Sequence, residues 1–108
     1  WDVQFQAEPA LRIPQRLTPI VFRITQEALN NAAKHARARR VQVSLQRSAA
    51  RLLLDVRDDG RGFAPEKRAS GGMGIAQMKQ RAREAGGELQ IRSQPGGGTH
   101  VQVRLPWG

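Results

Sequence analysis

Apolar and polar residues alternate in five stretches of the chain, which is the pattern of β-strands with one buried face. The short stretch Ser48–Ala50 separates the second stretch from the third, and the glycine-rich stretch Gln94–Gly98 separates the last two. Both separations predict hairpins. The apolar positions are Val3 and Phe5, then Val41, Val43 and Leu45, then Leu52, Leu54 and Val56, then Leu89 and Ile91, and finally Val101, Val103 and Leu105.

Two further segments have the signals of helices. Thr18-Pro19 provides an N-cap hydroxyl followed by proline at the first helical position, and predicts a helix from Pro19 to about Ala36. A second helix is predicted from Gly74 to Ala85, with Gly86 as its stop. Its apolar face consists of Ile75, Met78, Ala82 and Ala85. The stretch from Glu8 to Arg16 contains two prolines and predicts a loop, with room for one helical turn.

The order strand, helix, strand, strand, helix, strand, strand defines the fold class. Adjacent hairpins favour a mixed or largely antiparallel sheet, with the helices covering one face. We therefore expect an α/β fold, a two-layer sandwich with a mixed sheet of about five strands. The length of 108 residues suits one domain spanning 1–108.

A polar cluster follows the apolar start of the first helix. At about 100° per residue, Glu27 and Asn31 share a stripe with Ile20 and Ile24. His35 continues this stripe and Lys34 lies on its edge. A carboxylate and an amide facing the core need partners, and magnesium bound to phosphate would supply them through oxygen ligands and waters. Taken alone, an equally good interpretation places both side chains at the edge of the core, in contact with water.

Asp58 ends the third strand in phase with its buried residues, so it is predicted to point toward the covered face. Its neighbours Asp55, Arg57 and Asp59 are expected to point to solvent. A buried-face carboxylate needs a donor, and the exocyclic amine of adenine is a suitable one. Gly60 and Gly62 would allow close approach to a flat ring. The tripeptide alone equally fits a plain turn.

A second glycine-rich segment, Gly71–Gly74, directly precedes the second helix. Backbone amides at a helix start can bind an anion, and glycines let phosphate approach them. No Gly-Lys-Ser/Thr follows, so this is not a Walker loop. The stretch Gly96–Thr99 offers a further backbone or hydroxyl contact, although a hairpin turn explains it as well.

Composition narrows the function classes. The net charge of +9 invites a nucleic-acid interpretation, but the charges are spread along the chain and the aromatic residues form no stacking series. The densest basic run, Lys34–Arg40, suits a helix C-terminus. With no cysteine there is no disulfide and no zinc–thiolate site. No apolar run is long enough to span a membrane.

The order and spacing of these segments resemble sensor histidine kinases. Gln26–Ala36 resembles their N box, Asp58–Phe63 their first glycine box, Gly72–Ala82 their second, and Gly96–Thr99 their closing box. The similarity covers about Thr18 to Pro106 and is strongest to the nitrate-sensor-like subfamily. The family fold is the Bergerat α/β sandwich, shared with gyrase, mismatch-repair ATPases and heat-shock chaperones.

The resemblance implies a role for each matching residue. Asn31 would ligate Mg²⁺, Glu27 would support the metal and phosphates of ATP, and Lys34 and His35 would lie near the phosphates. Asp58 would bind the adenine amine. The positions implied to shape the nucleotide pocket and its lid are Gly60, Gly62, Phe63, Gly72, Met73, Gly74, Ile75 and Thr99.

Two residues depart from the family pattern, and both concern the nucleotide loops. Asp59 stands where asparagine is common, and Met73 stands where histidine is frequent. His35 and His100 do not suit the role of phosphoacceptor. The resemblance therefore implies a cytoplasmic ATP-binding domain whose partners are ATP or ADP, a separate dimerisation and phosphoacceptor domain, and a response regulator. A stand-alone serine kinase or ATPase resembling an anti-sigma factor is the alternative.

Overall fold

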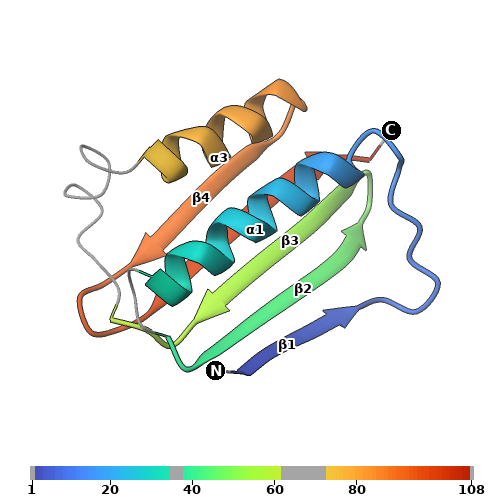
Figure 1. Ribbon diagram of the computed structural model, residues 1–108. Helices are drawn as coiled ribbons and strands as arrows, with labels where there is room; N and C mark the ends of the chain where they lie inside the picture. Colours follow the sequence, from blue (N-terminus) through green and yellow to red (C-terminus); the bar gives the residue numbers. More distant parts are fainter. Residues whose placement is uncertain (1, 35–37, 62–72, 108) are drawn as a thin grey trace.

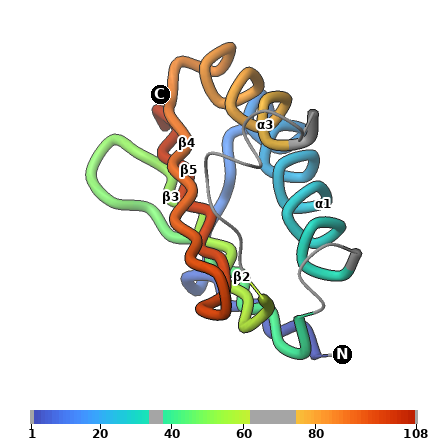
Figure 2. Tube along the Cα trace, turned by 90° about the vertical axis from the view of Figure 1, so that its left-hand side faces the viewer, coloured from blue at the N-terminus to red at the C-terminus, as the bar shows by residue number. Residues whose placement is uncertain are grey.

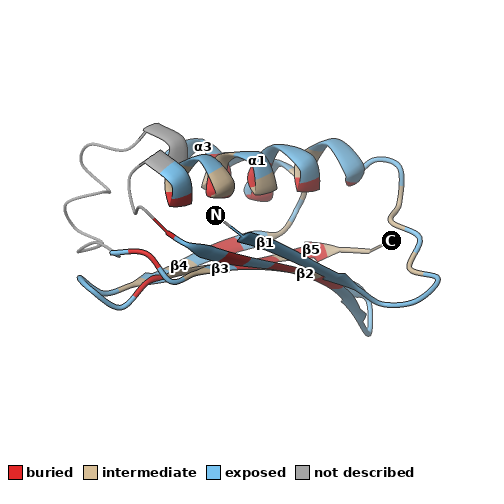
Figure 3. Cartoon of the chain, turned by 60° about the horizontal axis from the view of Figure 1, so that its bottom comes forward, coloured by how far each residue is buried: buried red, intermediate tan, exposed pale blue. Residues whose placement is uncertain are grey.

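The computed structural model describes residues 2–34, 38–61 and 73–107. Within them, two helices pack on one face of a five-stranded sheet (Figure 1). The opposite face of the sheet carries no helix among the described residues (Figure 3). The elements are β1 (Asp2–Ala7), α1 (Thr18–Lys34), β2 (Arg40–Ser48), β3 (Arg51–Asp58), α3 (Met73–Glu84), β4 (Glu88–Ser93) and β5 (Thr99–Pro106).

The sheet has the order β1-β2-β3-β5-β4 and is mixed, as predicted. β1 and β2 run parallel, with Val3 beside Val41, and the other neighbouring pairs are antiparallel. A parallel pair needs a crossover connection, and α1 lies within the segment that links β1 to β2. The α/β sandwich expected from the pattern is therefore confirmed.

Some boundaries differ from the predictions. The segment from Glu8 to Arg16 forms turns but no helical turn, because its prolines interrupt the backbone hydrogen bonds that a helix needs. β2 and β3 extend further than their apolar residues and meet at the two-residue turn Ala49-Ala50. α3 begins at Met73, one residue earlier than predicted.

The hydrophobic core lies between the helices and the covered face of the sheet. Along β2, β3 and β5 the buried residues alternate with exposed or half-buried ones, as the pattern predicted. α1 packs on β2 and β3, whereas α3 packs on β4 and β5 (Figure 2). At the sheet edge, Phe5 stays 61% exposed although it shares the phase of the covered face. Its strand lies beyond the cover of α1.

The buried stripe of α1 is rotated from the predicted one. Its residues are Val21, Ile24, Ala28 and Ala32, and the buried Leu17 lies just before the helix. Ile20, Glu27 and Asn31 are only half-buried at the margin of this stripe. Of the two interpretations of Glu27 and Asn31, the one that places them at the edge of the core is confirmed.

α3 ends in a Schellman motif. Gly86 has a φ of +81°, its amide donates to the Arg83 carbonyl, and the Gly87 amide donates to the Ala82 carbonyl at 2.8 Å. The predicted glycine stop is thereby confirmed. A Cβ built on Gly87 would lie 2.1 Å from the carbonyl oxygen of Arg104, so β4 approaches β5 closely only because this residue is glycine.

We expect Gly87→Ala to lower the free energy of unfolding by about 2 kcal/mol, since the backbone of β5 must move to admit the methyl group. Chemical denaturation measures this loss. Gly97→Ala is the matched control, because the atom nearest to a Cβ built on Gly97 is 3.4 Å away. Equal stability of the two variants would contradict the close approach.

Candidate functional site

Asp58 ends β3 on the side of the sheet that faces the helices. It continues the phase of Leu52, Leu54 and Val56, which are buried, and is itself half-buried. The Gly60 amide donates to Asp58 Oδ1 at 2.8 Å. Burial raises the pKa of Asp58, and repulsion from Asp59 adds to this, while amide hydrogen bonds from Gly60 and Thr99 oppose it. The result is an oriented carboxylate that is only partly desolvated and can accept a further donor.

The turn between β4 and β5 closes on this carboxylate. Thr99 lies beside Asp58 in the ladder between β3 and β5. Gly98 is buried with a φ of +79°, and a Cβ built on it would lie 2.3 Å from the Asp58 carbonyl oxygen. Ser93 Oγ donates to the Gly98 carbonyl at 3.1 Å and lies 2.9 Å from Thr99 Oγ1. The predicted closing stretch is therefore held against the end of β3.

Asp59 is solvent-exposed, as alternation predicted, and it also makes backbone contacts that alternation does not predict. Its carboxylate oxygen Oδ1 accepts the backbone amides of Arg39 at 2.8 Å and Arg40 at 2.9 Å. Its own amide donates to the Arg40 carbonyl. The amide of Arg40, then that of Arg39, lowers the pKa of this carboxyl. Asp59 is solvent-exposed, as expected, but it also fastens the loop after β3 to the start of β2.

Glu27 and Asn31 lie on the side of α1 that faces α3. Glu27 borders a small hollow of about 80 Å³ between the two helices, together with Arg23, Gln77 and Arg81. In the described part of the chain, no three His, Cys, Asp or Glu side chains gather where they could hold a metal ion. The oxygens of Glu27 and Asn31 would suit a magnesium ion only if phosphate and water supplied the remaining ligands.

Several predicted site residues fall at the margins of the described structure. Lys34 is the last residue of α1, and Met73 and Gly74 are the first two of α3. Ile75 is buried in the core beneath α3. The residues His35, Gly62, Phe63 and Gly72 lie outside the described residues. The structure therefore brings together Asp58, Gly60 and Thr99, and it places Glu27 and Asn31 on one helix face.

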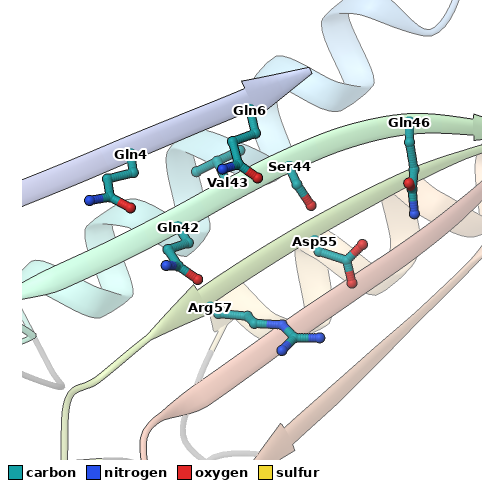
Figure 4. A pocket seen from close by; sticks show the side chains of 8 residues that line it. All are labelled: Gln4, Gln6, Gln42, Val43, Ser44, Gln46, Asp55 and Arg57. Carbon is teal, nitrogen blue, oxygen red and sulfur yellow. The ribbon is translucent and has the colours of Figure 1, made fainter. Parts of the chain in front are cut away.

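The uncovered face of the sheet holds features that the sequence reasoning missed. The Asp55 side chain lies 2.7 Å from His100 Nε2, and the two form a hydrogen bond. It is only 14% exposed, so the expectation that it is solvated is wrong. Asp55 also lines a hollow of about 270 Å³ on this face, together with several glutamines of β1 and β2. Figure 4 shows these side chains. The role of Ser93 was also missed, although its phase with Leu89 and Ile91 predicts that it points inward.

The fold and the geometry at Asp58 define a class of protein. A mixed sheet covered by two helices, with a half-buried aspartate and a close glycine turn at the end of a central strand, is an α/β sandwich with a polar site beside the helix layer. The family described as "Histidine kinase-, DNA gyrase B-, and HSP90-like ATPase" matches residues 18–108. The chain belongs to this family, whose ATPase domain implies ATP binding.

Named relatives agree with this assignment. The chain is 37% identical over 106 residues to the sensor histidine kinase LiaS of Bacillus subtilis, covering 98% of this chain and 28% of the relative. It is 34% identical over 95 residues to the histidine-protein kinase/phosphatase DegS of Brevibacillus brevis, covering 88% of this chain and 25% of the relative. The chain thus spans about a quarter of these relatives. The resemblance to the nitrate-sensor-like subfamily stays a prediction.

Solved structures show the same fold. The histidine kinase domain of the blue-light activated kinase EL346 from Erythrobacter litoralis superposes with a TM-score of 0.77 at 28% identity, covering 98% of this chain and 54% of that chain. The histidine kinase AdeS of Acinetobacter baumannii superposes with a TM-score of 0.79 at 15% identity, with the same two coverages. The second likeness concerns the fold alone.

We expect Asp59→Asn to destabilise the protein at neutral pH, since the two amides lose a charged acceptor. The folded pKa of Asp59 lies below its ordinary value of 3.8, so this carboxylate stabilises the fold above pH 3.8. Its contribution is lost as the pH falls through the folded pKa. Thermal melting of variant and wild type from pH 7 downward should show the difference shrinking below pH 3.8.

Glu8→Gln removes the same charge from an exposed side chain in the loop after β1 and serves as the control. Its melting temperature should follow that of the wild type across the same pH range. Identical curves for Asp59→Asn and Glu8→Gln would show that the amide contacts of Asp59 contribute nothing.

Proposed function

We propose that residues 1–108 form the catalytic domain of a sensor histidine kinase, which binds Mg-ATP and donates the γ-phosphoryl group to a histidine on a separate dimerisation domain. The half-buried, oriented carboxylate of Asp58 is the observation that carries the proposal. Family membership and the names of the relatives support the kinase assignment over a stand-alone serine kinase or ATPase. They likewise favour it over nucleic-acid binding.

At the adenine end, Asp58 accepts a hydrogen bond from the exocyclic amine. Gly60 fixes one carboxylate oxygen through its amide, so the carboxylate meets the base without reorganising. The turn at Gly98 and the residue Thr99 form the wall of the proposed adenine pocket on the side of β5. Gly62 and Phe63 belong to the same proposed pocket. Guanine presents a carbonyl at the corresponding position, so this arrangement selects ATP over GTP.

At the phosphate end, α1 supplies Asn31 as a metal ligand, with Glu27 one turn earlier supporting the metal and phosphates. Magnesium neutralises phosphate charge when bound. Lys34 and His35 contribute positive charge near the phosphates. The start of α3, with Gly72, Met73, Gly74 and Ile75, adds backbone amides that favour an anion. Phosphoryl transfer then depends on positioning and charge.

The phosphoacceptor histidine belongs to another domain in this proposal. His100 lies on the uncovered face of the sheet and contacts Asp55, away from the helix layer. The chain would therefore act with a helical dimerisation domain and, in the next step, with a response regulator. No described helix is long and apolar enough to cross a membrane, and we propose a cytoplasmic place for this domain.

Asp58→Asn is the decisive variant for the adenine end. We expect about 10- to 100-fold weaker ATP binding, since a hydrogen bond to a charged acceptor is lost. The pKa of Asp58 is raised by burial, so its ionised form costs stability at neutral pH and the variant should melt slightly higher. Isothermal titration with ATP and GTP, together with thermal melting, tests both effects.

Equal affinity of the wild type for ATP and GTP would contradict the role of Asp58. A variant that loses ATP binding because it unfolds would melt at a lower temperature, and this outcome separates loss of recognition from loss of structure. Asp55→Asn, on the uncovered face, is the matched control and should leave nucleotide affinity unchanged.

Asn31→Ala tests the metal end. Coupling between two bound ligands commonly reaches about tenfold or more, so ATP should bind the wild type about tenfold more tightly with magnesium than with EDTA. The variant should bind ATP equally in both. Asn30→Ala on the exposed face of α1 is the control. A magnesium effect that survives in Asn31→Ala would overturn the assignment.

A further inference from the structure

Three basic side chains stand in a row across the uncovered face of the sheet. His100 of β5 lies between Arg57 of β3 and Arg92 of β4, because both arginines are its partners in the strand register. Each of the three directly precedes or follows a residue that points toward the helices: Val56 precedes Arg57, Ile91 precedes Arg92 and Val101 follows His100. Because side chains alternate along a strand, all three basic side chains point away from the helices. We call Arg57, His100 and Arg92 the basic row.

The charge of this row is poorly balanced within the molecule. Asp55 contacts His100 at 2.7 Å. In the described part of the chain, neither Arg57 nor Arg92 forms an ion pair. Arg57 and Arg92 lie on the two strands that flank His100 and leave a local excess of positive charge there. Such an arrangement becomes favourable when a negatively charged ligand bridges the two arginines.

The row also borders a hollow that can admit a side chain. A depression of about 350 Å³ lies at the ends of β3, β4 and β5, lined by the three basic residues, by the turn 93–99 and by Asp58. Gly97 and Gly98 add no side chains to the hollow. Guanidinium groups bind carboxylates in a bidentate manner, so the arginines at the rim of the hollow suit a carboxylate better than a neutral group.

The spacing of the row indicates the form of its ligand. Neighbouring strands are about 4.8 Å apart, so Arg57 and Arg92 are about 10 Å apart. An extended peptide advances about 3.3 Å per residue, and carboxylates three residues apart would match the two arginines. Figure 3 shows that the uncovered face of the sheet lies opposite α1, where the proposed phosphate end is found.

We propose that the basic row is a docking site for an extended, carboxylate-rich segment of a partner protein. Charge complementarity carries the inference: a net charge of +9, two unpaired arginines in register, and a hollow between them. The side chains of the basic row point away from the helices, although the hollow beside them shares Asp58, Gly98 and Thr99 with the proposed adenine end. The docking proposal does not require that the protein bind nucleotide.

A capped hexaglutamate peptide is the probe, titrated into ¹⁵N-labelled protein at low ionic strength. We expect shifts at the backbone of Arg57, Arg92 and Gly98, and about tenfold weaker binding to the double variant R57Q/R92Q, since two charged contacts are lost. R12Q/R83Q removes the same charge from exposed sites elsewhere and should bind nearly as the wild type. Added salt should weaken binding.

Three outcomes would overturn the proposal. Equal losses in R57Q/R92Q and R12Q/R83Q would show that only net charge attracts the peptide. Tighter binding of tripolyphosphate than of hexaglutamate, lost in R57Q/R92Q, would make this a phosphate site. Loss of peptide binding in Asp58→Asn would place the peptide in the nucleotide site. Retained peptide binding in Asp58→Asn supports the proposal independently of ATP binding.

Discussion

The structure depends on one constraint: the helices cover a single face of the sheet. Along β2, β3 and β5, every second residue is therefore buried beneath α1 and α3. At the end of β3, the same alternation places the polar residue Asp58 on the covered face, where its carboxylate is partly desolvated. The candidate site is thus the end of the core, and its carboxylate is oriented by the same strand geometry that buries Leu54 and Val56.

Three aspartates within five positions show how strongly context decides the role of one residue type. Asp58 faces the helices and its pKa is raised by burial. Asp59 lies beyond the end of the strand, where two amides lower its pKa. Asp55 lies on the uncovered face against His100. Only the first of these environments lies on the helix side of the sheet, where the proposed nucleotide site is found.

Most of the fold could be predicted because alternation and helix caps are local signals. The five strands, Gly86 as a helix stop and the phase of Asp58 follow from residues a few positions apart. The rotation of α1 could not be predicted, since the helix pattern alone does not decide which neighbouring stripe, here the one with Ala28 and Ala32, is buried. The contacts of Asp59 and Asp55 join residues about 20 and 45 positions apart, and a single sequence does not contain that pairing.

The amide contacts of Asp59 have a mechanical consequence. They join the loop that follows β3 to the segment that follows α1. In the proposed function, the first segment recognises the base and the second lies next to the phosphate end. The base and the phosphates of one ATP molecule would then bind to two segments that Asp59 already holds together before ATP binds. The entropy of ordering these segments is lost during folding, so neither the base nor the phosphates would pay that cost on binding.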